Sequence, residues 1–371
     1  MNPPTKKLRV LIVDDSSFMR KVLHGIIADD PQMEIVGHAK DGREAISMAE
    51  SLKPDVITMD LNMPHMDGLQ ATEHIMSQSP RPIVVVSSES REGAASALIA
   101  LELGAIDFVS KPSGGIDLDM KSVAVDLNRK LKMAAKVRVI RTAARPKHRP
   151  VGVQHAAARA ETSNQGSDGN ATGGRFPIVV IAASTGGPAT VMRLATAFPA
   201  DFPAAIVLVQ HMPQNFTSQY AMQLAEVTEI EVKEAQANET LRESILYICP
   251  GSHHLRISSL GRIVLDEGPR ISGYLPCADV TMETAANWAG PMAIGIVLTG
   301  MGNDAAHGAQ AIRAAGGIVI AQDEATSVIF GMPAEAIKTG AVNHVLALDQ
   351  IFPATEKHIR QIARSSRAML R

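Results

Sequence analysis

Short runs of apolar, mostly β-branched residues alternate with amphipathic segments along most of the chain. In the N-terminal part, apolar runs cover residues 10–13, 35–39, 56–59, 83–86 and 107–109, and helical periodicity covers residues 18–27, 43–52, 69–76 and 94–103. Strands that alternate with helices in this way are typical of a parallel sheet with helices on both faces. We therefore expect an α/β domain over residues 1–130.

A second series of apolar runs begins near Phe176 and predicts a second α/β domain over residues 176–371. Strands are expected at residues 178–181, 205–210, 244–248, 293–299 and 317–321, and helices from Pro188 and at residues 305–315 and 333–339. Residues 254–258 and 262–266 flank a short turn with Gly261, which is typical of a β-hairpin. The pattern predicts a doubly wound, mostly parallel sheet with a hairpin insert.

Between the two series the apolar periodicity fades. Residues 138–149 carry several basic side chains among Ala and Pro, and residues 154–174 are rich in Ala, Gly, Ser, Asn and Thr. Such a composition cannot bury enough surface to offset its ordering entropy. We expect residues 131–175 to be a flexible linker, whose basic stretch is either a solvated arm or a contact for an acidic surface.

Composition narrows the class of protein. The chain has 371 residues with 46% hydrophobic and only 3% aromatic residues, so its cores depend on aliphatic side chains. A formal net charge of −2 provides no electrostatic argument for binding nucleic acid or a membrane surface. Two cysteines cannot build a disulfide framework, and neither a secretion signal nor an apolar run of membrane-spanning length is found. We expect a soluble cytoplasmic protein without membrane insertion.

Polar residues follow the expected strands of the first domain, at the sheet edge where ligands of such sheets bind. They are Asp14, Asp15, Asp60, Ser87 and Lys111. Carboxylates that converge at one edge repel each other unless a hard cation joins them, and Mg²⁺ with oxygen ligands fits. A lysine and a hydroxyl nearby suit a phosphoryl group. The alternative is a set of unrelated strand-end caps.

These residues resemble the receiver domain of bacterial response regulators, which implies a flavodoxin-like (βα)5 fold. The matching motifs are Leu11-Ile12-Val13-Asp14-Asp15-Ser16, Asp60-Leu61-Asn62-Met63-Pro64, Met66-Asp67-Gly68 and Lys111-Pro112. The resemblance implies phosphorylation of Asp60 by a histidine kinase. It also implies that Asp14, Asp15, Asp60 and the backbone carbonyl of Asn62 hold Mg²⁺, that Lys111 contacts the phosphoryl group, and that Ser87 and Phe108 are the switch residues.

Three residue types needed for acyl transfer follow three separate strands of the second domain. Ser184 stands on a strand-to-helix turn, His211 follows the next strand, and Asp304 follows Gly300-Met301-Gly302-Asn303. A serine hydroxyl needs an imidazole to accept its proton, and the imidazole needs a carboxylate to fix its tautomer. Each residue alone could be an ordinary cap of a strand or helix. Their common place at one sheet edge favours a catalytic triad that needs no metal.

The second domain resembles the chemotaxis protein-glutamate methylesterase family. The matching motifs are Ala183-Ser184-Thr185-Gly186-Gly187, Gln210-His211-Met212-Pro213, Leu298-Thr299-Gly300-Met301-Gly302-Asn303-Asp304 and Phe330-Gly331-Met332-Pro333. The resemblance implies Ser184 as nucleophile, His211 as general base and acid, and Asp304 as its orienting carboxylate. It adds the Met301 N–H as an oxyanion donor and Thr185 as a lining residue. The implied substrates are methyl-accepting chemotaxis receptors, with glutamine deamidation as a second activity.

The chain departs from the family pattern at Ala182, at Ala305 and in Pro276-Cys277-Ala278-Asp279-Val280, where Pro-Ser-Val-Asp-Val is more usual. The last segment is expected to face the substrate. The resemblance implies an esterase activated by phosphorylation of Asp60 by the chemotaxis histidine kinase. Two other interpretations remain. One is a phosphorylation-dependent adaptor that binds receptors without catalysis, and the other is the same esterase in a different sensory pathway.

Overall fold

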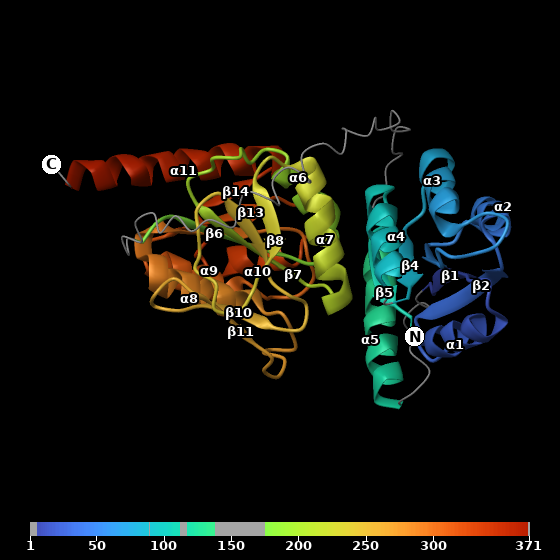
Figure 1. Ribbon diagram of the computed structural model, residues 1–371. Coiled ribbons are helices and arrows are strands. Elements are labelled where there is room, and N and C mark those ends of the chain that lie inside the picture. The colour runs from blue at the N-terminus through green and yellow to red at the C-terminus, as the bar shows by residue number, and fades with distance from the viewer. Residues whose placement is uncertain (1–5, 89, 112–116, 138–174, 370–371) are drawn as a thin grey trace, which may run out of the picture.

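The computed structural model describes residues 6–88, 90–111, 117–137 and 175–369, which form two large sheets that each carry helices on both faces, and one separate two-stranded pair (Figure 1). The linker expected at residues 131–175 lies mostly outside the described residues. Helix α5 continues to Ala134, so the expected boundary at residue 130 falls inside this helix. Leu131 and Ala134 are buried in the core of the first domain.

The first sheet is parallel, with five strands in the order β2-β1-β3-β4-β5, and it has the predicted flavodoxin-like topology. All of its predicted strands and helices are present within a few residues, and α5 is the one helix that the apolar pattern did not indicate. The elements are β1 (Leu8–Val13), α1 (Ser17–Ala28), β2 (Met33–Ala39), α2 (Gly42–Leu52), β3 (Val56–Met59), α3 (Gly68–Gln78), β4 (Ile83–Ser87), α4 (Arg91–Glu102), β5 (Asp107–Ser110) and α5 (Asp117–Ala134).

The second sheet is also parallel, with seven strands in the order β14-β13-β12-β6-β7-β9-β8, and the predicted hairpin β10–β11 is a separate antiparallel pair. The elements of the second domain up to the end of the hairpin are β6 (Ile178–Ala183), α6 (Gly187–Ala195), β7 (Ala205–Gln210), α7 (Gln214–Val227), β8 (Glu231–Glu234), β9 (Ile245–Ile248), β10 (His254–Ile257) and β11 (Ile263–Asp266). The remaining elements are α8 (Ala278–Ala289), the short 3₁₀ helix η1 (Gly290–Met292), β12 (Ala293–Val297), α9 (Ala306–Ala314), β13 (Ile318–Gln322), α10 (Met332–Lys338), β14 (His344–Leu346) and α11 (Leu348–Met369).

Burial explains why β6, β7 and β12 lie at the centre of the second sheet. Every residue of these three strands is buried, as expected where helices cover both faces. Because neighbouring parallel strands end at the same edge, the loops after β6, β7 and β12 meet above the middle of the sheet. This edge is where the sequence places Ser184, His211 and Asp304.

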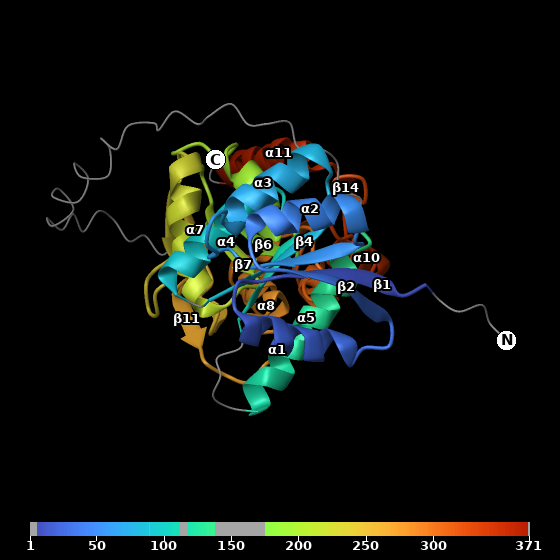
Figure 2. The same ribbon diagram turned by 90° about the vertical axis from the view of Figure 1, so that its right-hand side faces the viewer.

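The two domains contact each other directly. Helix α4 packs on α7 and α6, and Figures 1 and 2 show α4 and α7 side by side from both directions. At the centre of the contact, the ring of Phe108 from β5 stacks on that of Phe216 from α7, with centroids 4.2 Å apart. Residues of both domains therefore share one apolar cluster.

Within the described part of the chain, no helix combines the length and the apolar character needed to cross a membrane. The long C-terminal helix α11 instead carries charged side chains along its length, including Glu356, Lys357 and Arg360.

Gly68 at the start of α3 provides a test of how tightly the first domain is packed behind Asp60. A Cβ added at Gly68 would lie 2.0 Å from the carbonyl oxygen of Asp60 and 2.8 Å from the Cα of Leu61. Both obstacles are backbone atoms, so Gly68→Ala is expected to lower the free energy of unfolding by about 1–3 kcal/mol. Urea denaturation followed by circular dichroism measures the change.

The matched control is Gly25→Ala in the exposed part of α1, where an added Cβ meets nothing within 4 Å. This variant should be more stable than the wild type by about 0.5–1 kcal/mol, because alanine loses less conformational entropy in a helix. Equal effects of the two substitutions would contradict the close approach of Gly68 to Asp60.

Candidate active site

The register of two central strands places Ser184 and His211 side by side. Ser184 follows β6 directly and His211 follows β7 directly, and the last residues of these strands, Ala183 and Gln210, are partners across the parallel pair. Neighbouring strands lie about 4.8 Å apart. Ser184 and His211 therefore lie side by side, each one position beyond the end of its strand.

Hydrogen bonds hold the turn that carries Ser184. Its N–H donates to the Thr299 carbonyl at 3.0 Å, and its own carbonyl accepts the N–H of Gly187 at 2.8 Å and the side-chain amide of Gln210 at 2.9 Å. A Cβ at Gly300 would lie 2.8 Å from the Cβ of Ser184, so only glycine allows this close approach. The turn is thereby tied to the ends of both neighbouring strands, β7 and β12.

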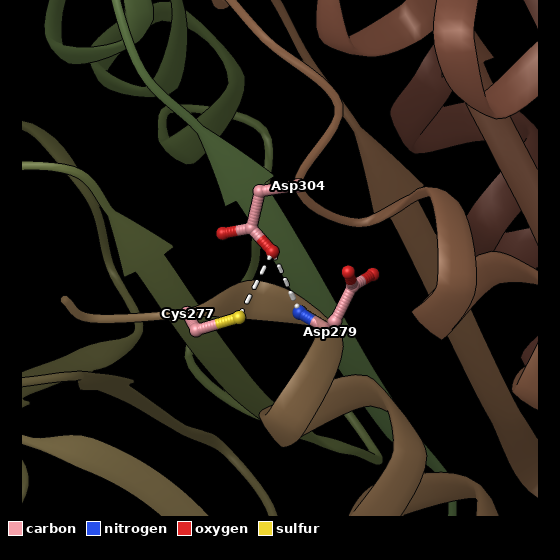
Figure 3. A group of neighbouring side chains, drawn as sticks. All are labelled: Cys277, Asp279 and Asp304. Carbon is pink, nitrogen blue, oxygen red and sulfur yellow. Dashed lines mark hydrogen bonds between the residues drawn. The ribbon is translucent and has the colours of Figure 1, made fainter. Parts of the chain in front are cut away.

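A buried carboxylate orients the imidazole. The Nε2 atom of His211 lies 2.7 Å from Oδ2 of Asp304, whose side chain is 0% exposed. Asp304 also accepts bonds from the N–H groups of Ala278 at 2.7 Å, Asp279 at 2.9 Å and Ala305 at 2.9 Å, and from the thiol of Cys277 at 3.3 Å. Figure 3 shows Cys277 and the Asp279 N–H pointing at one oxygen of Asp304. Two of these donors are the first N–H groups of α8, where the helix dipole favours a negative charge.

These donors keep Asp304 ionised. Burial alone would raise the pKa of Asp304, but the hydrogen bond and charge of His211, with the N–H groups of Ala278 and Asp279, hold it below its usual range. Burial, followed by the negative charge of Asp304, raises the pKa of the Cys277 thiol to about 12, so the thiol keeps its proton and donates it. Cys277, Asp279 and Asp304 have ligand atoms close enough to surround a cation, but both Asp304 oxygens already accept several donors.

The Asp304 contact decides the tautomer of His211. An ionised carboxylate can only accept, so Nε2 carries the hydrogen in this bond and Nδ1 is the nitrogen left with a lone pair. Among the described residues, no hydrogen bond joins the Ser184 hydroxyl to His211. Ser184 is 9% exposed and directly follows the strand that neighbours the one before His211.

The other two predicted residues of this site differ in their surroundings. Within the described chain, the Met301 N–H has no hydrogen-bond partner, as an oxyanion donor requires. The Thr185 hydroxyl instead donates to Oδ2 of Asp107 in the first domain, at 2.6 Å. Thr185, the residue next to Ser184, is thus hydrogen-bonded to the first domain.

The carboxylates of the first domain converge as the sequence predicts. Ligand oxygens of Asp14, Asp15 and Asp60 all lie within 4.8 Å of one another, which fits a hard divalent cation. Lys111 lies between two of them, 2.9 Å from Asp14 and 2.8 Å from Asp60. Burial raises the pKa of the Asp60 carboxyl, which Lys111 partly offsets.

The remaining predicted residues of the first domain surround this cluster or connect it to the second domain. The Ser87 hydroxyl donates to the Gly93 carbonyl in α4 at 2.9 Å, and the Asn62 N–H lies 3.4 Å from Oδ1 of Asp60. Phe108 is buried against Phe216. Its carbonyl accepts a bond from Lys130 at 2.6 Å.

Four residues that contact the site were not among its predicted members. Asp107 binds Thr185, Cys277 and Asp279 bind Asp304, and the ring of Tyr274 stacks on that of His211. The sequence offered a signal only for the Cys277 segment, through its departure from the family motif. Tyr274 and Asp107 reach the site from segments far away in sequence.

Comparisons with known proteins show the family of both domains. Residues 10–121 match the response regulator receiver domain, and residues 179–355 match the CheB methylesterase family. A protein-glutamate methylesterase/protein-glutamine glutaminase of Pyrococcus horikoshii is 42% identical over 359 residues, covering 93% of this chain and 92% of the relative. One from Symbiobacterium thermophilum is 40% identical over 360 residues, covering 95% of this chain and 98% of the relative.

Among solved structures, the catalytic domain of Thermotoga maritima CheB methylesterase is 39% identical and covers 50% of this chain and 98% of its own, with a TM-score of 0.47. The two curated relatives share both domains with this chain over nearly its whole length. The chain therefore belongs to the protein-glutamate methylesterase/protein-glutamine glutaminase family of response regulators.

Proposed function

We propose that this protein hydrolyses methyl esters of glutamate side chains on methyl-accepting chemotaxis receptors and deamidates receptor glutamines, with Ser184, His211 and Asp304 as its catalytic residues. The observation that carries the proposal is the 2.7 Å bond between a buried, ionised Asp304 and His211, which follows the strand next to the one that Ser184 follows. The names of the relatives supply the substrate class.

The reaction divides into two acyl transfers. Ser184 Oγ attacks the ester carbonyl while Nδ1 of His211 accepts the hydroxyl proton, and Asp304 balances the charge of the imidazolium. The Met301 N–H donates to the oxyanion, and Thr185 lines the site. His211 then returns the proton to the departing methanol, or to ammonia when the substrate is a glutamine. Water cleaves the acyl-enzyme by the same route.

Substitution of the nucleophile tests this role. Ser184→Ala is expected to reduce methanol release from a methyl-labelled receptor to the uncatalysed level, because no covalent intermediate can form. Phosphorylation of Asp60 should be unchanged, since Asp60 belongs to the other domain. Methanol release is counted as volatile label, and residual enzymatic release by the variant would remove Ser184 from the mechanism.

The first domain is the proposed regulator of the esterase activity. We propose that a chemotaxis histidine kinase donates a phosphoryl group to Asp60, with Asp14, Asp15, Asp60 and the Asn62 carbonyl holding Mg²⁺. When bound, the ion would neutralise negative charge on the transferred group. Lys111 already lies within 3 Å of Asp60 and is positioned to contact the phosphoryl oxygens. Ser87 and Phe108 are the proposed switch residues.

The contact between the domains supports inhibition before phosphorylation. The hydrogen bond from Thr185 to Asp107 attaches the first domain to the residue next to Ser184, and both side chains are buried. Phe108 stacks on Phe216 one residue further along β5. We propose that this contact keeps the receptor away from Ser184. Phosphorylation of Asp60 would shift the protein from this closed state to an open state in which the contact is released. The shift can be only as large as the extra free energy by which the phosphoryl group stabilises the open state over the closed one.

Asp107 provides a test of this control that leaves the triad intact. Asp107→Ala removes the acceptor of the Thr185 hydroxyl, so the closed state loses a buried hydrogen bond to a charged group. We expect the esterase rate of the unphosphorylated full chain to rise by about tenfold, and the phosphorylated rate to stay the same. The measurement is methanol release with and without a phosphoryl donor.

Asp126→Ala is the matched control. Asp107 and Asp126 both pair with Lys130, at 3.3 Å and 3.2 Å, but only Asp107 contacts Thr185. The control should leave the unphosphorylated rate unchanged. A rate increase of the same size in both variants would attribute the effect to Lys130 and contradict the role of the Thr185 contact.

A further inference from the structure

Tyr274 lies against the catalytic imidazole, although it comes from neither of the strands that carry the site. Its ring is nearly parallel to that of His211, with centroids 4.9 Å apart and planes 16° apart. This is the geometry of an offset stack. One face of His211 is therefore covered by an aromatic ring.

The backbone around Tyr274 holds the ring in place. Ile271 and Tyr274 exchange both backbone hydrogen bonds, at 3.0 and 2.9 Å, across a two-residue turn in which Ser272 and Gly273 have φ values of 51° and 88°. Positive φ at both central positions is typical of the tight turns that close hairpins. The turn projects Tyr274 from the segment between β11 and α8 towards His211.

The hydroxyl of Tyr274 is bound to the loop that carries Asp304. It donates to Oδ1 of Asn303 and accepts the N–H of the same residue, both at 3.2 Å. Gly302 allows this contact, because a Cβ there would lie 2.0 Å from the hydroxyl oxygen. Tyr274 thus joins the imidazole to the residue that precedes its carboxylate partner.

A single hydrogen bond does not fix the orientation of the His211 ring. The bond from Nε2 to Asp304 fixes one ring nitrogen but permits the ring to tilt about that contact, which would move Nδ1 away from the serine. A ring packed flat on the face of His211 opposes this tilt. It also favours the imidazolium, because a cation is attracted to an aromatic face.

We propose that Tyr274 is a positioning residue for His211, holding the imidazole in plane for proton transfer and stabilising its charged form. The proposal rests on the function proposed for Ser184 and His211. Because imidazolium forms only on the way to the transition state, the contribution should be found in kcat and not in KM.

The test compares Tyr274→Phe, which keeps an aromatic face, with Tyr274→Leu, which keeps apolar bulk without one. In the full chain with a phosphoryl donor, we expect Tyr274→Leu to lower kcat by about tenfold with KM within twofold of the wild type, and Tyr274→Phe to retain at least a third of the wild-type kcat. Rates are measured well below the melting temperature of each variant.

Arg270→Ala is the control for the turn. The Arg270 side chain donates to the Gly273 carbonyl at 3.3 Å, so this variant perturbs the same turn without removing the ring. It should leave kcat within twofold of the wild type. If Tyr274→Leu also leaves kcat within twofold, or raises KM alone, Tyr274 does not position the imidazole.

A second readout is independent of the natural substrate. An alkyl fluorophosphonate forms a bond between Ser184 Oγ and phosphorus while the P–F bond breaks, fluoride leaves and His211 takes the hydroxyl proton. Tyr274→Leu should react about tenfold more slowly than the wild type and Tyr274→Phe within threefold. If the wild type reacts with this probe but releases no methanol from the receptor, the proposed substrate is wrong. The ratio of the probe reaction rates of Tyr274→Leu and the wild type then still tests the role of Tyr274. A wild type inert to both would overturn both proposals.

Discussion

The second domain depends on the burial of one carboxylate. Asp304 is 0% exposed, and a charge in such a place is tolerated only when its oxygens are fully satisfied. Three backbone N–H groups, a thiol and an imidazole together meet that requirement. Because two of the donors are the first residues of α8, the helix, the loop after β12 and the end of β7 must meet at one point. The same requirement that keeps the charge buried also fixes the ring of His211.

The contacts that satisfy this charge also give the geometry that the proposed acyl transfer needs. The pKa of Asp304 is held below its usual range despite burial, so the group stays acceptor-only and leaves the lone pair on Nδ1 of His211. The Cys277 thiol, whose pKa is raised to about 12, contributes a proton without becoming reactive. The ring of Tyr274 lies nearly parallel to the same imidazole and covers one of its faces.

Strand β5 connects the two sites of the molecule over a short distance. It begins at Asp107, which binds Thr185, continues through Phe108, which stacks on Phe216, and ends one residue before Lys111, which contacts Asp60. The aspartyl cluster and the neighbour of Ser184 are therefore separated by only a few residues of a single strand.

The sequence by itself indicated the buried strands of both sheets and the polar residues at their ends, because buried parallel strands need continuous apolar runs and polar residues appear where those runs stop. It did not indicate the edge strands β8 and β14, which are only partly buried. It predicted that Asp60 and Lys111 meet in one domain and His211 and Asp304 in the other, and these side chains are in contact. Only the tertiary structure decided which ring nitrogen faces Asp304, and that Asp107 and Tyr274 reach the site. Those contacts join segments with no shared local pattern. They depend on strand order, register and side-chain direction, which exist only once the sheets have formed and packed.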